Sequence, residues 1–408
     1  MPHNRIERLL LAELDKLQAE GRRKGDETVI TGVIPAQGGR GPRYRVAGEG
    51  DRPFLRMNAN NYLGLSLLAE MIEAEEAGCR SFGTGPGAVR FIGGTWAPHV
   101  ALEHSIAAFH RRPAAMVFSS AYATVMGVLP PLITPETAVI SDELNHNSII
   151  NAIRLARPRE RHVYRHLDLG ELEARLVAAT KSCRRAIIVT DGVFSMRGDH
   201  APLAEIAAIA QRYDASFAEN ALVVVDDSHG VAAFGETGRG SEEQTGAAAD
   251  LLIATLGKGF GVNGGYVAAS PAVIAYLRET SPFYVYSNPI APGEAAAAGR
   301  ALALVDGTAG RALLGHLRAM SGRFRMGLTA RGFETIPGEH PIVPAMIRDS
   351  GRTAALVRHL RGRGILATGL NFPVVPRGDE EIRFQICADH TAADIDEALQ
   401  ALADFQPR

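Results

Sequence analysis

Four successive apolar runs, each ending in polar residues, constrain the fold of this 408-residue chain most strongly. Segments with helical character separate the runs, which cover residues 138–140, 186–190, 222–225 and 251–254. Continuously apolar strands that alternate with helices are typical of a parallel sheet covered on both faces. The sequence therefore predicts an α/β fold with a mostly parallel central sheet flanked by helices.

The polar residues that follow these runs predict where a ligand binds. In open α/β sheets, ligands bind beyond the carboxyl ends of the strands. A single Asp or His at a strand end is usually structural, but four strands that end this way favour one shared site. The polar segments are 142–147 (Asp-Glu-Leu-Asn-His-Asn), 191–195 (Asp-Gly-Val-Phe-Ser), 226–230 (Asp-Asp-Ser-His-Gly) and 255–261 (Thr-Leu-Gly-Lys-Gly-Phe-Gly).

The last of these segments places Lys258 among glycines, where the backbone can come close to a ligand. Burying a lysine costs free energy, so a lysine at the end of a buried strand suggests a chemical role for its amine. A desolvated, deprotonated lysine amine can attack a carbonyl group to form a Schiff base. Pyridoxal phosphate is the cofactor that uses this chemistry most often. Taken alone, the segment favours a surface lysine in a loop, so the case for a cofactor site depends on the rest of the chain.

Two other segments are candidate phosphate sites. Ser119 and Ser120 lie between an apolar strand at 115–118 and a helical run through 125–129. Free N–H groups at such a helix start bind anions, although helix capping by serine explains the pattern equally well. The glycine cluster at 83–87 matches neither the dinucleotide-binding nor the P-loop spacing, so it adds little.

Charge and cysteine content narrow the function classes. The formal net charge of −2 gives no reason to expect a nucleic-acid partner. The three cysteines are far apart and fit neither a disulfide framework nor a metal-binding pattern, so we expect no metal and a reducing, cytoplasmic setting. We also expect no signal peptide and no integral membrane segment, because no apolar run approaches membrane-spanning length.

The flanking regions predict three segments. Residues 1–56 are expected to form an N-terminal helix over 5–18, followed by a connector rich in Gly and Pro. One face of this helix is apolar, so we expect it to pack on a neighbouring element or subunit. Residues 57–290 form the large domain. Residues 291–408 form a smaller α+β domain, entered through an alanine-rich helix over 291–305. Its other elements are a helix over 353–360, strands over 365–368 and 382–386, and a last helix capped by Thr391 and Asp394.

In this order and spacing, five short motifs resemble the α-oxoamine synthases, a family of fold-type-I pyridoxal phosphate transferases. The motifs are residues 60–65 (Asn-Asn-Tyr-Leu-Gly-Leu), 144–146, 190–196, 226–230 and 255–258. Residues 89–95, 337–344 and 372–376 are similar to the glycine C-acetyltransferase branch of that family. The resemblance spans roughly residues 57–402 and implies a homodimer with shared active sites.

The resemblance also implies roles for individual residues. Lys258 would hold the cofactor through its amine and then act as the base at the substrate Cα. Asp226 would pair with the pyridine nitrogen, and His146 would stack on the ring. His229 and Ser195 would hydrogen-bond the phenolic oxygen of the cofactor, although Ser195 is equally well explained as a capping residue.

Further residues are implied as ligands of the phosphate and the substrate. The phosphate would be held by the N–H groups of Ala121 and Tyr122, the hydroxyl of Thr255, and Ser287 and Asn288 from the partner. Thr255 also fits a capping role. Asn60 and Arg383 would bind the carboxylate of the amino-acid substrate. The alternative is that Arg383 is an exposed arginine without a functional role.

The expected activity is a Claisen-type condensation of a small amino acid with an acyl-CoA, with glycine and acetyl-CoA favoured. Serine with a long-chain acyl-CoA, as in serine palmitoyltransferase, is an alternative, and so is a reaction like that of 8-amino-7-oxononanoate synthase. Two further alternatives are an aminotransferase and a non-catalytic subunit of a synthase heterodimer. Non-catalytic subunits lack the cofactor-binding lysine, whereas this chain has Lys258, which argues against the second alternative. Residues 215–221 are longer than the family pattern and predict an extra loop, while residues 83–88 match no single acyl specificity.

Overall fold

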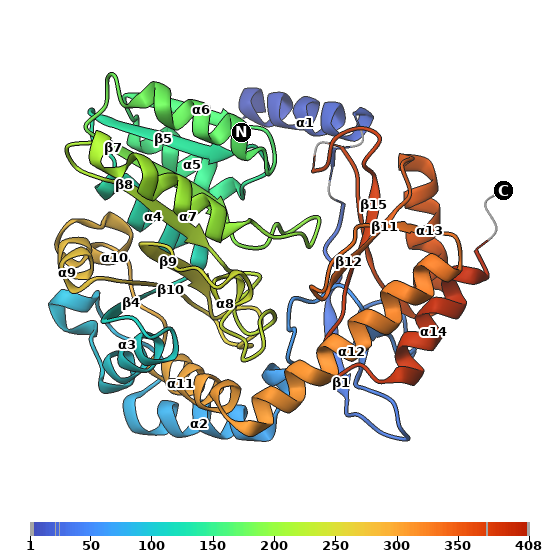
Figure 1. The fold of residues 1–408 in the computed structure, drawn as a ribbon. Helices are drawn as coiled ribbons and strands as arrows, with labels where there is room; N and C mark the ends of the chain where they lie inside the picture. The colour runs from blue at the N-terminus through green and yellow to red at the C-terminus, as the bar shows by residue number, and fades with distance from the viewer. Residues whose placement is uncertain (1–3, 21, 24, 373, 406–408) are drawn as a thin grey trace. The chain divides into compact units, whose positions relative to one another are not determined.

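The computed structural model describes residues 4–20, 22–23, 25–372 and 374–405, and it contains the sheet that the sequence predicts (Figure 1). Seven strands are arranged in the order β4-β10-β9-β8-β7-β5-β6. Their bounds are β4 (Ala114–Phe118), β10 (Gly265–Ala269), β9 (Leu251–Thr255), β8 (Ala221–Asp226), β7 (Arg185–Asp191), β5 (Thr137–Asp142) and β6 (Glu160–Tyr164). The strands from β9 to β6 are parallel, and β10 is antiparallel to both of its neighbours. The predicted α/β fold is thus confirmed.

Helices cover both faces of this sheet (Figure 1). On one face pack α4 (Ala121–Leu132), α5 (Asn147–Ala156), α9 (Pro271–Thr280) and α10 (Pro282–Val285). On the other face pack α6 (Leu169–Ala179) and α7 (Leu203–Tyr213). Successive residues of one strand face opposite layers, as Ile187 and Ile188 of β7 do. Because both faces are covered, the central strands β5, β7, β8 and β9 are almost entirely buried and mainly apolar.

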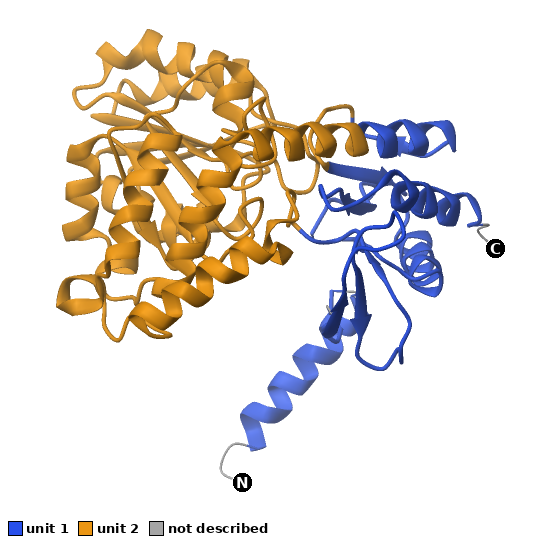
Figure 2. Cartoon of the chain, turned by 90° about the horizontal axis from the view of Figure 1, so that it is seen from below, with its two compact units in different colours: residues 1–59, 322–336, 342–408 blue, residues 60–321, 337–341 orange. Residues whose placement is uncertain are grey.

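The chain divides into two compact units (Figure 2). Unit 1 comprises residues 1–59, 322–336 and 342–408, and unit 2 comprises residues 60–321 and 337–341. This division differs from the predicted one, because the N-terminal segment shares a unit with the C-terminal part. The backbone N–H of Gly41 donates to Asp394, 2.8 Å away, and Arg43 forms an ion pair with the same carboxylate at 2.7 Å.

The helix predicted to open the small domain instead belongs to unit 2. It is α11 (Pro292–Asp306), and it packs against α2 (Ala69–Phe82) and α3 (Ala97–Phe109). A Cβ atom added to Gly78 would lie 2.8 Å from the Cα of Gly293, so only glycine permits this close approach of α2 and α11. The chain continues through α12 (Thr308–Ala330). Unit 2 also contains α8 (Ser241–Thr245).

Unit 1 contains an antiparallel sheet in the order β11-β12-β15-β14. Its strands are β11 (Glu334–Thr335), β12 (Ile342–Met346), β15 (Glu381–Gln385) and β14 (Thr368–Leu370). The unit's helices α13 (Ser350–Gly362) and α14 (Ala392–Ala403) agree with the prediction, and Thr391 and Asp394 form the predicted capping box. A further pair is formed by β3 (Leu55–Arg56) and β13 (Ile365–Leu366).

The N-terminal region differs in part from its prediction. The connector contains a hairpin of β1 (Ile30–Ile34) and β2 (Arg43–Val46). The first helix, α1 (Asn4–Ala19), forms as expected, yet none of its described residues is buried. Its apolar face is instead exposed, with Leu9 67% and Leu10 57% accessible to solvent. Residues 1–3 and 406–408, at the ends of the predicted segments, and Pro373 of the 372–376 motif lie outside the described residues.

The segment expected to form an extra loop, residues 215–221, is a compact turn. Residues Asp214–Ser216 form a short 3₁₀ helix, and the backbone N–H of Ala221 donates to the Asp214 carboxylate at 2.9 Å. No helix formed by the described residues is long and apolar enough to cross a bilayer.

Candidate active site

Several predicted site residues line one cavity of unit 2, beyond the carboxyl ends of β7 and β8. The residues that line it are Ala121, Tyr122, His146, Ser148, Asp191, Val193, Asp226, Ser228, His229 and Lys258. Six of them, Ala121, Tyr122, His146, Asp226, His229 and Lys258, are among those that the family resemblance implies. The convergence of strand ends expected from the sequence is therefore present.

A chain of polar contacts runs from Lys258. The Lys258 Nζ lies 2.9 Å from the Nε2 of His229, and the Nδ1 of His229 lies 2.7 Å from the Tyr62 hydroxyl. The Tyr62 hydroxyl in turn donates to the Asn60 Oδ1 at 3.4 Å. One proton assignment satisfies all three contacts: the ammonium donates to Nε2, and the Nδ1–H donates to the tyrosine oxygen. This arrangement directs the lysine amine into the cavity and fixes the tautomer of His229.

Tyr62 is a site residue that the sequence analysis did not identify. It lies within the Asn60–Leu65 motif, but a span of 167 residues separates it from His229. The ring of His340 supports the other side of this contact, because its Nε2 lies 2.8 Å from the backbone oxygen of His229. The motif itself was the only signal that could have pointed to Tyr62.

The loop between β9 and β10 positions Lys258. Its two ends are joined by the hydrogen bond from the Leu256 N–H to the Gly264 oxygen at 2.9 Å. The Gly261 N–H donates to the Lys258 oxygen at 2.9 Å, and Gly261 has a φ of 72°, a conformation that favours glycine. A Cβ on Gly259 would lie 2.6 Å from the Ala232 oxygen, so close packing also requires glycine there. The glycines therefore permit a tight, anchored loop.

Two carboxylates face the lysine from adjacent strands. Asp191 and Asp226 are register partners at the ends of β7 and β8. The Oδ1 of Asp226 accepts from the Ser228 N–H at 3.1 Å, and the Oδ2 of Asp191 accepts from the His146 N–H at 3.2 Å. Burial raises the pKa of the Asp191 carboxyl well above its usual value, and the negative charge of Asp226 acts in the same direction.

The Oδ1 of Asp191 is buried and has no hydrogen-bond partner among the described residues. An unsatisfied buried oxygen that lines a cavity indicates that a bound group completes its contacts. Asp191 opens the predicted polar segment 191–195, but the sequence analysis assigned it no role. The general expectation that polar strand ends share a site would have found it.

His146 is held as a neutral ring at the start of α5. Its Nδ1 accepts a hydrogen bond from the Ser148 N–H at 3.2 Å and lies 2.7 Å from the Ser148 hydroxyl oxygen. Burial lowers the pKa of His146 below its usual value. A neutral, fixed imidazole is suited to stacking on a planar ring, which is the role that the resemblance implies.

The start of α4 supplies an anion site. The Ser120 hydroxyl caps the helix by accepting from the Ala123 N–H at 3.1 Å, which bears out the capping interpretation. The N–H groups of Ala121 and Tyr122 belong to the first helical turn, where no intrahelical acceptor is available. They line the cavity and suit a phosphate group, so the two interpretations of Ser119 and Ser120 are compatible.

Replacing Gly265 with Ala should weaken binding of pyridoxal phosphate. A Cβ at Gly265 would lie 2.4 Å from the Ala121 nitrogen, so the first turn of α4 would have to move. We expect the dissociation constant for pyridoxal phosphate to rise by about tenfold or more, measured by fluorescence titration. Gly299→Ala in α11 is the control, since no described atom lies within 4 Å of a Cβ there. Equal affinities for both variants would contradict the assignment.

Four predicted ligands do not line this cavity. Thr255 donates to the Gly264 oxygen at 3.1 Å and accepts from the Gly257 N–H at 3.0 Å, which is the capping role considered for it. Ser195 is half-buried in the turn after β7. Ser287 and Asn288 follow α10 and are half-buried and exposed, respectively. Their roles toward a cofactor remain predictions.

The predicted carboxylate ligands come from different units. Arg383 is a half-buried residue of β15 in unit 1, and with the Gln385 amide correctly oriented its Nη1 donates to the Gln385 oxygen at 2.8 Å. Asn60 is the first residue of unit 2. Their pairing at one substrate carboxylate remains a prediction.

Removing the Tyr62 hydroxyl should slow the reaction. In Tyr62→Phe the His229 ring loses one hydrogen-bond partner, at a cost of about 1 kcal/mol, so we expect kcat to fall about fivefold. The control is Tyr266→Phe, because the Tyr266 hydroxyl makes an equivalent bond of 2.8 Å to His110, which does not line this cavity. Steady-state kinetics of both variants check the prediction, and equal losses of kcat would refute it.

One cluster resembles a metal site by composition. Donor atoms of Cys387, Asp389 and His390 lie within 4.8 Å of one another. However, the His390 Nδ1 accepts from the Cys387 N–H at 3.2 Å, and its Nε2 lies 3.1 Å from the Arg56 oxygen. Burial raises the pKa of the Cys387 thiol well above its usual value, which opposes formation of a metal-binding thiolate. The cluster is therefore accounted for as a hydrogen-bonded turn.

Comparisons with known proteins identify the family of this chain. Residues 52–402 match the model of the family described as aminotransferase class I and II. The human mitochondrial 2-amino-3-ketobutyrate coenzyme A ligase is 39% identical over 399 residues, which cover 97% of this chain and 91% of the relative. The ligase of the same name from Escherichia coli (strain K12) is 40% identical over 96% of this chain and 95% of the relative.

Other relatives carry different names. The 8-amino-7-oxononanoate synthase of Geobacter sulfurreducens is 38% identical, covering 97% of both chains. A solved structure of serine palmitoyltransferase from S. paucimobilis, with a bound PLP–myriocin aldimine, superposes with a TM-score of 0.86 at 26% identity. That match covers 97% of this chain and 96% of the other. Each of these proteins is similar to nearly the whole of this chain, and their names state different activities.

Proposed function

Because this chain belongs to the class I and II aminotransferase family, and within it to the α-oxoamine synthases, we propose that it is a pyridoxal-phosphate-dependent acyltransferase. It condenses a small amino acid with an acyl-CoA in a Claisen-type reaction. Glycine and acetyl-CoA are the favoured substrates, since relatives named 2-amino-3-ketobutyrate coenzyme A ligase are 38–40% identical over nearly the whole chain. The observation that carries the proposal is that Lys258 contacts His229 in one cavity with Asp226.

The residues of the cavity fit pyridoxal phosphate. The N–H groups of Ala121 and Tyr122 would hold the phosphate, and the neutral ring of His146 would stack on the pyridine. The carboxylate of Asp226 supplies an acceptor for a protonated ring nitrogen, and Asp191, its register partner on β7, has one oxygen left for a further hydrogen bond. When bound, the cofactor supplies an electron-withdrawing ring that stabilises negative charge at the amino-acid Cα.

The protein's own groups then carry out three tasks. Lys258 moves the proton at Cα, and its contact with His229 at 2.9 Å holds the amine in place. Tyr62 fixes the His229 ring from the other side. Overall, one proton leaves Cα, a C–C bond forms to the thioester carbonyl, and the C–S bond breaks to release CoA. Roles for Ser195, Thr255, Asn60 and Arg383 are proposed on the family resemblance.

One experiment tests the substrate choice. An acyl-CoA series from acetyl to palmitoyl is incubated in turn with glycine, serine and alanine, while free thiol and product mass are measured. We expect the fastest thiol release with glycine and acetyl-CoA. A preference for serine with long chains would favour the serine palmitoyltransferase alternative. Transamination without any thiol release would overturn the proposal, and product mass also shows whether the keto acid loses CO₂.

We also propose a cytoplasmic homodimer with shared sites. The exposed apolar face of α1 and the 80% exposed side chain of Tyr286, next to Ser287 and Asn288, support a subunit contact. Three free cysteines are consistent with a reducing compartment. Light scattering on a size-exclusion column measures the mass, and a value of one chain, 43.5 kDa, would contradict the dimer.

A further inference from the structure

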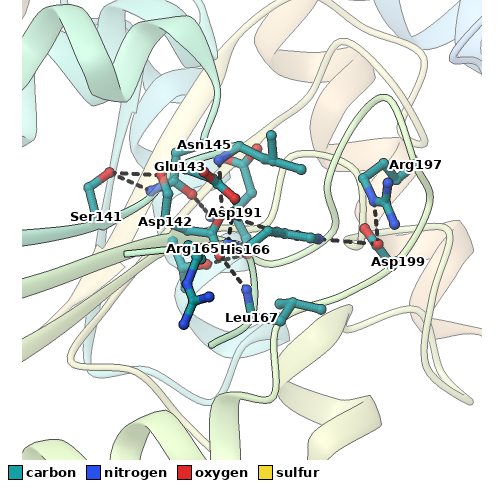
Figure 3. Close-up of polar contacts among 12 residues, drawn as sticks. Ser141, Asp142, Glu143, Asn145, Arg165, His166, Leu167, Asp191, Arg197 and Asp199 are labelled. Carbon is teal, nitrogen blue, oxygen red and sulfur yellow. Dashed lines mark hydrogen bonds and ion pairs between the residues drawn. The ribbon is translucent and has the colours of Figure 1, made fainter. Parts of the chain in front are cut away.

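A polar cluster next to the active site is centred on His166, in the turn between β6 and α6 (Figure 3). The His166 Nδ1 lies 3.1 Å from the Asp142 Oδ1, and the Nε2 lies 3.2 Å from the Asp199 Oδ2. The side chain is only 13% exposed. The ring also forms a T-shaped pair with the Phe194 ring, at a centroid distance of 4.4 Å and an interplanar angle of 87°. None of these residues lines the cavity described above.

The geometry of these contacts requires a charged ring. An ionised carboxylate only accepts hydrogen bonds, so a ring nitrogen that faces one must carry a proton. Both nitrogens of His166 face carboxylate oxygens, of Asp142 and Asp199. A neutral imidazole carries one N–H and would leave one contact unsatisfied. His166 therefore satisfies both contacts only as an imidazolium.

The other charged groups around the ring agree with this assignment. The Glu143 carboxylate accepts the backbone N–H of His166 at 2.8 Å. Arg197 donates to Asp199 at 2.7 Å, and the neighbouring Arg165 pairs with Asp168 and Glu171 on the solvent side. Burial opposes the charged ring, but the bonds to Asp142 and Asp199 outweigh it and raise the pKa of His166 to about 9.

The first partner of His166 holds the loop that carries His146. The Asp142 carboxylate accepts the backbone N–H groups of Leu144, at 2.9 Å, and Leu167, at 3.0 Å. The next residue, Asn145, bonds the backbone of β7 at Val189, at 2.8 Å. Asp142 thus organises the turn from which His146 enters the cavity.

The second partner holds the loop after β7. The backbone oxygen of Asp199 accepts the Phe194 N–H at 2.9 Å, and residues 193 and 200 form a bridge. This loop carries Val193, which lines the cavity, and Ser195. His166 is therefore the side chain that joins the carboxylates of the two loops.

We propose that His166 is a positioning residue for the condensation reaction, acting as an imidazolium that ties the His146 loop to the Val193–Ser195 loop. It touches neither substrate nor cofactor and acts through Asp142 and Asp199. Loss of its charge releases one or both carboxylates and lets the outer parts of the two loops shift, while the bonds of Asn145 and His146 to Asp191 still hold the bases of the loops together. The catalytic consequence rests on the proposed function, whereas the link between the loops does not.

The first test measures the link without substrate. Histidine ring signals are followed by NMR from pH 5 to 10.5, and the signal missing in His166→Gln identifies residue 166. We expect a midpoint near pH 9 for His166 in the wild type, and the His146 signals should move with the same midpoint. In His166→Gln that movement of His146 should vanish. Asp199→Asn removes one ionised acceptor and should lower the midpoint of His166.

The second test compares rates across pH. At pH 7, His166→Gln should lower kcat/KM for thiol release by about tenfold, since small misplacements of site groups have effects of this order. Above pH 10 the wild type has also lost most of the charge, so the ratio of the two rates should approach one. A residue needed only for packing would give a constant ratio. The matched control is His162→Gln on β6, whose ring pairs with Glu160 at 2.8 Å, away from both loops.

The outcomes separate the two proposals. A His166 midpoint near 6.5, or a His146 signal that ignores the pH 9 transition, overturns the loop link whatever the enzyme's activity. A rate ratio that stays constant with pH overturns the positioning role. Absence of thiol release from every variant and the wild type, with the NMR results as expected, overturns the proposed function but leaves the link intact. If His166→Gln does not fold, the Asp199→Asn titration decides.

Discussion

Lys258→Ala should abolish thiol release while leaving the protein folded. The amine is the one cavity group able both to bind the cofactor covalently and to move the Cα proton, so we expect a loss of about 10⁴-fold or more. The loop that carries it is joined through backbone bonds of Leu256, Gly261 and Gly264, which the substitution leaves intact. Circular dichroism and thermal unfolding of the variant should therefore match the wild type.

Lys181→Ala is the matched control for this substitution. Lys181 is an exposed lysine in the turn before β7, so its removal changes the net charge by the same amount. Its activity should equal that of the wild type. A Lys258→Ala protein that retains more than a few per cent of the activity would remove the central assignment of the site.

Asp226→Asn and Asp227→Asn should differ sharply although the two residues are adjacent. Asp226 lines the cavity, and its negative charge is expected to stabilise positive charge on the cofactor ring. Neutralising it should lower kcat by about 10³-fold. Asp227 does not line the cavity, and it is buried against glycines, where a Cβ on Gly192 or Gly230 would lie 2.3 or 2.1 Å from its Oδ1. Its amide variant should therefore keep nearly normal kcat.

Asp227 also makes the free energy of unfolding depend on pH. Burial raises the pKa of Asp227 to about 8, so the carboxyl is mostly protonated at pH 7. A raised pKa in the folded state gives stability that is complete below the unfolded pKa, near 3.9, and is lost as the pH rises through about 8. The free energy of unfolding should fall between these values in the wild type, and this contribution should be missing in Asp227→Asn.

Urea unfolding at a series of pH values measures this contribution, and rapid-quench kinetics measures the rates. Equal kcat losses in Asp226→Asn and Asp227→Asn would show that the charge at residue 226 has no special role. An Asp227→Asn protein with the same pH dependence of stability as the wild type would contradict the assignment of a protonated Asp227.

The sequence predicted the central strands because each signal was local. The strands β5, β7, β8 and β9 are continuously apolar and buried, which is why they stand out from the alternating pattern of surface strands. Their polar ends then placed His146, Asp226, His229 and Lys258 in one cavity. No three-dimensional information was needed for that inference beyond the rule for strand ends.

Two strands of the same sheet went unpredicted, for different reasons. The edge strand β6 has the sequence Glu-Arg-His-Val-Tyr and alternates in burial, so its charged residues hide it among polar segments. The strand β10 follows the glycine-rich loop of Lys258 and itself begins with a glycine, so it merges with that loop in the sequence. Its antiparallel direction depends on the length of that loop, which joins β9 to β10 directly.

Contacts between residues far apart in the sequence could not be predicted either. The contact of Tyr62 with His229 and that of His340 with the His229 backbone each join segments more than 100 residues apart. The link of His166 to Asp142 and Asp199 likewise depends on which strands are neighbours. No local pattern specifies such pairs, because hydrogen-bond partners are set by the order of strands in the sheet.

The position of β4 at the edge of the sheet bears on how the protein matures. Among the described strands, β4 hydrogen-bonds only to β10, which is translated about 150 residues later. Pairing across so long a stretch forms slowly, since much chain entropy must first be lost. The helix start that follows β4 therefore acquires its neighbour Gly265 only after the ribosome has completed the whole sheet. Vitamin B6 uptake during biosynthesis should then mark the end of folding rather than assist its early steps.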